Sequence, residues 1–334
     1  MVDRVNQWRG AGRSARQAAD RTPPAVLFTS PQSIASRCRE AWHRCSRTAA
    51  AERGLRSPRG GVGGCPCVPR DLRKSMLNYQ IAQRAQIGVI IPSTNTGVEY
   101  DLQKFAVQGV TWHPSRFWVE LPEWMQRVDE TGAPVDDVFE ACLEKIATQI
   151  PSAIRNALSA KVQHLMIGMN AENIWGGLEG ERRFEAGIRE QIGPDVGLTT
   201  SARACREALN RFGAKRISMI TPYPPVGDQN VTRFFSDIGF EVKATKGLCR
   251  PSATEIATTT TQQVLDIVRE VDGDDVDAIV QVGTNLSTSD IFPVLEHTLG
   301  KPCIPNNLAT IWQAYRDCGI DDKVYGKGRL FEEF

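Results

Sequence analysis

Residues 165–177 read Leu-Met-Ile-Gly-Met-Asn-Ala-Glu-Asn-Ile-Trp-Gly-Gly, and this stretch decides the fold. A short apolar run stops at Gly168 and gives way to amides, a carboxylate, a tryptophan and paired glycines. Buried strands of parallel sheets are continuous apolar runs, and ligand-binding loops follow their carboxyl ends. The stretch therefore predicts a buried parallel strand that leads into a polar loop at the mouth of a crevice.

A second stretch, residues 278–287, repeats this pattern as Ala-Ile-Val-Gln-Val-Gly-Thr-Asn-Leu-Ser. The segments before the two stretches also correspond, because residues 87–92 and 217–222 are both β-branched runs that end at a proline. Each run is followed by a loop, a helical pattern, a glycine and another strand pattern. Such an internal repeat indicates a duplicated unit.

Alternating strands and helices imply parallel sheets with right-handed crossovers. We therefore predict an α/β fold of two similar parallel-sheet α/β domains related by a pseudo-twofold duplication, with the active site between them. The first domain is expected to comprise residues 85–199 plus 305–334, and the second residues 200–304.

The pattern of apolar residues predicts individual elements along the chain. Predicted strands cover residues 87–91, 109–116, 165–168, 196–199, 216–220, 240–242 and 278–282. Predicted helices cover residues 98–105, 135–158, 182–191, 201–212, 260–271, 287–299 and 306–318. Pro151 is expected to kink or divide the second of these helices, and Ser201 to cap the fourth.

The composition is that of a folded, water-soluble protein of 334 residues, with 41% hydrophobic and 24% charged residues. No apolar run reaches the roughly 18 residues that cross a bilayer, so we expect no membrane association. The net charge of +1 is the sum of a basic N-terminal segment and an acidic remainder. Residues 1–75 hold 15 basic against 5 acidic side chains, and residues 76–334 hold 25 against 34. The acidic folded part is therefore not expected to bind nucleic acid.

Nine cysteines are scattered without the paired spacing of a zinc site, which favours reduced thiols in a cytoplasmic protein. His113, His164 and His297 form no metal-binding pattern, so no metal is predicted. The loops carry neither of the glycine-rich motifs that bind nucleotides, and no cofactor is predicted. Cys142 and the other cysteines beyond residue 75 are expected in the core, away from the loops.

Residues 1–75 are rich in Arg, Ala, Ser, Gly and Pro and lack apolar periodicity. Three interpretations remain open for this segment. It resembles a mitochondrial transit peptide in its arginine content, and a nucleic-acid arm in its charge, although no aromatic residues are interleaved to stack on bases. The third interpretation, which we favour, is a disordered or spurious basic extension with Met76 as the effective start.

Four loops follow the predicted strands, and all are rich in hydroxyls, amides and free backbone N–H groups: residues 93–96, 169–172, 221–223 and 283–285. Donors at the start of helices suit carboxylates and oxyanions. Each loop alone is explained by ordinary turns and helix caps. Four of them in symmetric places favour a crevice that binds a small carboxylate.

Residues 87–99, Ile-Gly-Val-Ile-Ile-Pro-Ser-Thr-Asn-Thr-Gly-Val-Glu, resemble the opening motif of maleate cis-trans isomerases and arylmalonate decarboxylases, in the Asp/Glu racemase superfamily. Shorter matches follow in the same order: His-Pro-Ser-Arg (113–116), Thr-Pro-Tyr (221–223), Gly-Phe-Glu-Val (239–242), Gly-Thr-Asn-Leu (283–286) and Gly-Lys-Pro (300–302). Together they span residues 87–320. The resemblance implies an enzyme that acts on a small carboxylate and forms a homodimer.

The resemblance also implies the substrate-binding residues. These are Ser93, Asn95, Met169, Asn170, Ala171, Tyr223, Gly283, Thr284 and Asn285. Ser252 matches a further binding position of the isomerases loosely. The racemases of the superfamily use two cysteines, and this chain has Met169 and Gly283 at those positions. Neither residue supplies a thiolate or a proton, which argues against thiol-dependent racemisation and isomerisation.

Decarboxylation asks less of the protein, since it needs a desolvated pocket for the leaving carboxylate and donors for the developing enediolate. Glu172 is our candidate for the proton donor, because a carboxyl group beside Met169 and Trp175 is expected to have a raised pKa. Tyr223 is the second catalytic candidate. We therefore predict a cofactor-independent decarboxylase or cis-trans isomerase for a substituted malonate or maleate. A carboxylate-binding homologue without catalysis, and a hydrolase or hydratase using Glu172, remain alternatives.

Overall fold

The structure is a computed structural model that describes residues 80–120 and 136–334, and the predicted basic extension lies outside them. Within the described residues, short apolar runs form eight strands: β1 (Ala85–Pro92), β2 (Val110–Phe117), β3 (His164–Ile167), β4 (Gly197–Thr199), β5 (Arg216–Thr221), β6 (Glu241–Gly247), β7 (Ala278–Gln281) and β8 (Cys303–Pro305). They make two sheets, ordered β2-β1-β3-β4 and β6-β5-β7-β8. Every strand pair is parallel, and the two orders are the same. The predicted duplicated α/β fold is confirmed.

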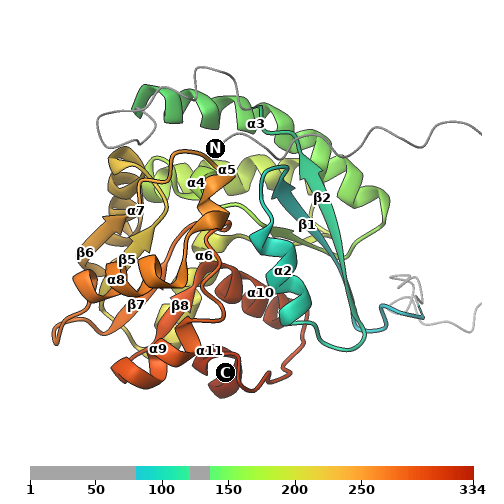
Figure 1. Ribbon diagram of the computed structural model, residues 1–334. Helices are drawn as coiled ribbons and strands as arrows, with labels where there is room; N and C mark the ends of the chain where they lie inside the picture. Colours follow the sequence, from blue (N-terminus) through green and yellow to red (C-terminus); the bar gives the residue numbers. More distant parts are fainter. Residues whose placement is uncertain (1–79, 121–135) are drawn as a thin grey trace, which may run out of the picture. The chain divides into compact units, whose positions relative to one another are not determined.

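Helices follow the strands in the same sequence in both halves (Figure 1). They are α2 (Gly97–Lys104), α3 (Asp136–Ser159), α4 (Ala171–Ile174), α5 (Gly177–Ile192), α6 (Ser201–Phe212), α7 (Pro225–Asp237), the 3-10 helix η3 (Glu255–Thr258), α8 (Thr261–Val271), α9 (Phe292–Leu299), α10 (Asn306–Asp317) and α11 (Arg329–Glu333). No helix in the described part of the chain is long and apolar enough to span a membrane.

One apolar core is shared by both sheets. Alternate residues of the central strands, such as Ile87 and Val89 in β1 and Met219 in β5, face this core, where Trp312 and Tyr315 are also buried. Helices α6 and α10 pack against each other within it (Figure 1). The opposite faces of the sheets are covered by α3 and α5 in the first half and by α8 and α9 in the second. The boundaries that we predicted for the two domains stay a prediction.

Pro151 does not divide α3, because Ile146, Ile150 and Ile154 on both sides of it are buried against the first sheet; a kink at Pro151 stays a prediction. Two other local predictions were wrong. Helix α9 begins at Phe292 rather than residue 287, because the hydroxyls of Thr288 and Ser289 bond to other segments. Thr200 caps α6 in place of Ser201, whose hydroxyl donates to a backbone carbonyl after β3.

Two asparagines join the halves where β1 and β7 end, and we call this arrangement the Asn95–Asn285 clasp. The Asn285 Oδ1 atom accepts hydrogen bonds from the backbone N–H groups of Thr96 (2.9 Å) and Gly97 (3.1 Å). In return, the Asn95 amide donates to the Thr284 hydroxyl over 2.8 Å. The Thr96 side chain does not cap α2, so Asn285 caps it from the other half of the chain.

Gly97 permits this close approach. A Cβ atom at position 97 would lie 3.0 Å from the Thr284 carbonyl oxygen and 3.4 Å from the Asn285 Cα atom. Any larger residue would push the two loops apart. The clasp therefore depends on the sequence at both strand ends.

Replacement of Asn285 by alanine is expected to lower the free energy of unfolding by about 1–3 kcal/mol, because the buried Gly97 N–H group and its neighbour lose their acceptor. Asn285→Asp keeps the accepting oxygen but loses the amide that donates to the Ala253 carbonyl over 2.9 Å, so its loss of stability should be smaller than that of Asn285→Ala. Urea unfolding of the full chain compares the two variants. An equal loss in both, or no loss in Asn285→Ala, would contradict the capping role.

Candidate active site

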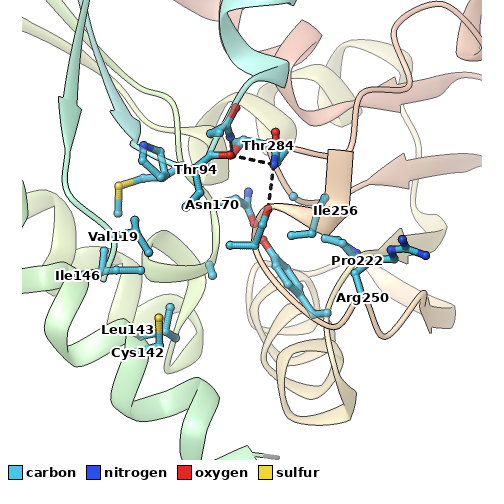
Figure 2. Close-up of a pocket in the computed structure, with 18 of the residues that line it drawn as sticks. Thr94, Val119, Cys142, Leu143, Ile146, Asn170, Pro222, Arg250, Ile256 and Thr284 are labelled. Atoms are coloured by element: carbon cyan, nitrogen blue, oxygen red, sulfur yellow. Dashed lines mark hydrogen bonds between the residues drawn. The ribbon is translucent and has the colours of Figure 1, made fainter. Parts of the chain in front are cut away.

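A cavity of about 120 Å³ lies where the carboxyl ends of β1, β3, β5 and β7 meet (Figure 2). It collects residues from all four predicted loops and from α3. Its lining consists of Pro92, Thr94, Asn95, Val119, Phe139, Cys142, Leu143, Ile146, Met169, Asn170, Ala171, Glu172, Pro222, Tyr223, Pro224, Arg250, Ser252, Ala253, Ile256, Gly283, Thr284 and Asn285.

Nearly all of the site residues proposed from the sequence are among these, including both catalytic candidates and the loosely matched Ser252. Ser93 is the exception. Its hydroxyl accepts a hydrogen bond from the Val119 backbone N–H group over 2.9 Å, and its carbonyl accepts from Arg116. Ser93 therefore holds the wall residue Val119 in place and does not face the cavity.

One end of the cavity is rich in unused hydrogen-bond donors. The Thr284 hydroxyl accepts from Asn95, so its own proton is free to point elsewhere. Within residues 80–120 and 136–334, the backbone N–H groups of residues 283–285 have no acceptor, and the Tyr223 hydroxyl has no partner. This polar end suits a carboxylate or an enediolate.

The polar end is held by a buried carboxyl group outside the cavity. Asn307 donates one hydrogen bond to the Thr284 carbonyl oxygen and another to Asp101, each over 2.8 Å. Burial raises the pKa of Asp101, and its bonds from Ser289 and Asn307 oppose that rise. Asp101 lies in α2, so the first half of the chain fixes the Thr284 loop of the second.

Gly283 cannot be replaced without strain. Its φ angle is +105°, and a Cβ atom there would lie 2.7 Å from the Cδ atom of Pro222. The Tyr223 hydroxyl oxygen would be 3.4 Å from the same Cβ atom. The backbone conformation that exposes the neighbouring N–H groups therefore excludes a side chain at this position.

Asn170 is in the lining, but its amide group faces away from a ligand. Both of its donated bonds are internal, to the Ser201 hydroxyl (2.9 Å) and to the Asn306 side-chain oxygen (2.7 Å). Its Oδ1 atom is buried and has no partner among the described residues. The Asn170 amide therefore has no free donor for a ligand, which differs from the carboxylate-binding role expected of it.

The other end of the cavity is apolar and comes largely from α3, through Phe139, Cys142, Leu143 and Ile146. Figure 2 shows three of these side chains grouped with Val119, apart from Thr94 and Thr284. The Phe139 ring contacts the rings of Tyr223 and Trp175, with centroids 5.8 and 5.7 Å apart. The sequence indicated that α3 has a buried face, but gave no sign that this face closes the site.

Cys142 corrects our expectation that the cysteines lie away from the loops. It is buried and lines the cavity, and burial raises the pKa of its thiol to about 11, with a contribution from Glu172. The thiol is therefore protonated at neutral pH.

Glu172 stands in the first turn of α4 and is half-buried. Burial raises the pKa of its carboxyl group to about 7, and a hydrogen bond with its own backbone N–H group opposes the shift. Burial also raises the pKa of Tyr223, to which the nearby Glu172 and Asp228 carboxylates add. Tyr223 therefore keeps its proton at every physiological pH.

Arg250 is the cation among the lining residues, and no role for it was predicted from the sequence. Its guanidinium group donates to the Glu255 carbonyl over 3.3 Å and to the Thr258 hydroxyl over 2.7 Å. Figure 2 shows the guanidinium group directed away from the centre of the cavity. The described residues contain no cluster of three or more His, Cys, Asp or Glu side chains suited to a metal ion.

Comparison with known proteins supports this picture. Maleate isomerase of Nocardia farcinica is 25% identical over 257 residues, which covers 74% of this chain and 96% of that protein. Arylmalonate decarboxylase of Bordetella bronchiseptica is 27% identical over 155 residues, covering 45% of this chain and 65% of that protein.

Solved structures show the same fold. A mutant of the Nocardia farcinica maleate cis-trans isomerase with a covalently bound succinylcysteine intermediate superposes with a TM-score of 0.66 at 21% identity, over 75% of this chain and 99% of that one. A liganded mutant of arylmalonate decarboxylase gives 0.60 at 20% identity, over 75% and 100%. The family model described as arylmalonate decarboxylase matches residues 131–331. The chain therefore belongs to the arylmalonate decarboxylase family.

Proposed function

We propose that this protein is a cofactor-independent decarboxylase of malonates that carry an apolar substituent, with Glu172 as the proton donor. The observation that carries the proposal is the division of the cavity into one end with unused donors and one apolar end from α3. Such a cavity matches a substrate with one carboxylate to hold, one to lose and an apolar group to bury. The family supports a decarboxylase, and its relatives include both arylmalonate decarboxylase and maleate isomerase.

Maleate suits the cavity less well. It carries a carboxylate at each end, and one of them would lie against Leu143 and Ile146 without a donor. Arg250 does not pair with such a carboxylate, because its guanidinium group is directed away from the cavity toward Glu255 and Thr258 (Figure 2). Burial of an unpaired carboxylate is costly. In a malonate the carboxylate at the apolar end leaves as carbon dioxide, whereas both carboxylates of maleate stay on the product, so the apolar end favours a malonate.

In the proposed reaction, the retained carboxylate accepts hydrogen bonds from the Thr284 and Tyr223 hydroxyls and from the backbone N–H groups of residues 283–285. The second carboxylate lies at the apolar end, where the loss of hydration favours its departure as carbon dioxide. Its carbon–carbon bond breaks, and the electron pair passes into an enediolate on the retained carboxylate. The same donors stabilise the growing negative charge.

The α-carbon must then receive a proton, and three acids line the cavity. A general acid works best when its pKa is close to the working pH. The pKa of Glu172 is about 7, that of Cys142 is about 11, and that of Tyr223 is raised further. On this ground we assign the proton transfer to Glu172. Tyr223 then acts as a hydrogen-bond donor that stays protonated.

Incubation of the full chain with phenylmalonate is expected to release carbon dioxide and leave phenylacetate. The conversion is measured by NMR. Methylmalonate should react with a kcat/KM that is about 10- to 100-fold lower, because burial of an aromatic group contributes roughly 1.5–3 kcal/mol. Maleate should give no fumarate. Conversion of maleate, or binding of phenylmalonate without release of carbon dioxide, would contradict the proposal.

Glu172→Gln is expected to lower kcat by about 10²–10⁴-fold, since the variant has no proton to donate. In the unchanged protein kcat should fall as the pH rises through about 7, where Glu172 loses its proton. The glutamine variant should lose this dependence. Glu190→Gln, at an exposed position of α5, serves as the matched control and should keep both the rate and the pH profile. If Glu172→Gln behaved like this control, Glu172 would not be the donor.

A further inference from the structure

A second cavity lies behind Glu172. It is a groove of about 410 Å³ between α3 and α5, distinct from the substrate cavity. Two residues, Leu143 and Glu172, line both the groove and the substrate cavity. Glu172 therefore stands in the wall that separates the two spaces.

The rest of this wall is aromatic. Trp175 lines the groove, Phe139 lines the substrate cavity, and their rings contact each other with centroids 5.7 Å apart. Trp175, Phe139 and Leu143 have no titratable group, so Glu172 is the titratable residue of this wall. Glu172 is half-buried and belongs to the lining of both spaces.

The proposed reaction consumes one proton per turnover. The carbon–carbon bond to the departing carboxylate breaks, and a bond forms between the α-carbon and the Glu172 proton. Glu172 is left as a carboxylate, and the next turnover requires a proton from water. During this step the substrate cavity holds the product, which stands between Glu172 and the polar end.

We propose that the groove between α3 and α5 is the route by which solvent protons reach Glu172, separate from the opening used by the substrate. This inference rests on the proposed function. It makes Glu172 a proton carrier between two compartments, rather than a group that exchanges its proton through the substrate cavity.

The charges around Glu172 fit such a route. On the groove side, α3 contributes Glu140 and Glu144, which are one helical turn apart, and α5 contributes Arg183. On the cavity side, the charge of Glu172 contributes to the raised pKa values of the Cys142 thiol and the Tyr223 hydroxyl, so these groups hold their protons more tightly than Glu172 does.

Gly187 allows the groove to be blocked without disturbing the site. It lines the groove on the exposed side of α5, and a Cβ atom there would meet nothing within 4 Å. Gly187→Trp fills the groove, while Gly187→Ala leaves it open and serves as the matched control. Ala147→Trp fills it from the α3 side, so the test does not depend on the folding of a single variant.

With phenylmalonate as the probe, both tryptophan variants are expected to lower kcat by about tenfold, a part of the 10²–10⁴-fold that general acid catalysis contributes. Their solvent deuterium isotope effect on kcat should rise, because proton uptake becomes rate-limiting, and KM should not increase. Gly187→Ala should behave like the unchanged protein.

Two results would overturn the proposal. One is unchanged kcat in folded tryptophan variants, and the other is a lower kcat without a larger isotope effect, which indicates a structural disturbance. Circular dichroism verifies that each variant is folded. An unchanged protein that releases no carbon dioxide would instead refute the proposed function, so the two failures are distinguishable.

Discussion

The Asn95–Asn285 clasp is the constraint on which the site depends. The two sheets end in short polar loops, and nothing in either sheet alone fixes one loop against the other. The clasp does so with side chains that serve the opposite half: Asn285 caps α2, and Asn95 bonds Thr284. Because Asn95 supplies a donor to the Thr284 hydroxyl, that hydroxyl keeps its own proton for a ligand. The contact that joins the halves therefore also prepares the donors of the cavity.

The chemistry follows from how the two ends of the cavity differ. At the polar end, Gly283 holds a backbone conformation that no larger residue adopts easily, and this leaves successive N–H groups unpaired. At the other end, α3 brings apolar side chains over the loops and removes water. Glu172 lies between these environments, and burial raises its pKa into the range useful for proton donation. The resemblance puts the family cysteines where this chain has Met169 and Gly283, and we propose that Glu172 takes over the proton transfer.

The strands and most of the site loops could be predicted from sequence, because apolar runs that stop at a glycine or proline are local signals. The identity of Glu172, Tyr223 and Thr284 as cavity residues followed from these strand ends. The roles of the asparagines did not follow, because an amide bonds equally well to a ligand or to another loop. Asn170 and Asn285 form their hydrogen bonds with other groups of the protein.

The apolar end could not be predicted for a different reason. The periodicity of α3 shows that one face is buried, but the covering of a site by Phe139 and Cys142 depends on how a helix lies across two loops distant in sequence. Arg250 was not predicted to line the cavity, because the segment in which it follows a strand carries no recognisable motif. The groove behind Glu172 arises from the packing of α3 on α5, and the spacing of residues in the sequence does not predict how these two helices pack. The homodimer and the interpretations of residues 1–75 stay predictions.

The most direct measurement is a crystal structure of the full chain with phenylacetate, the expected product. We predict that its carboxylate accepts hydrogen bonds from Thr284, Tyr223 and the backbone N–H groups of residues 283–285, with the phenyl ring against α3. A Glu172 carboxyl oxygen should lie about 3–3.5 Å from the α-carbon, the separation needed for reaction. A carboxylate bound at the α3 end, or an α-carbon closer to Cys142 than to Glu172, would contradict the account.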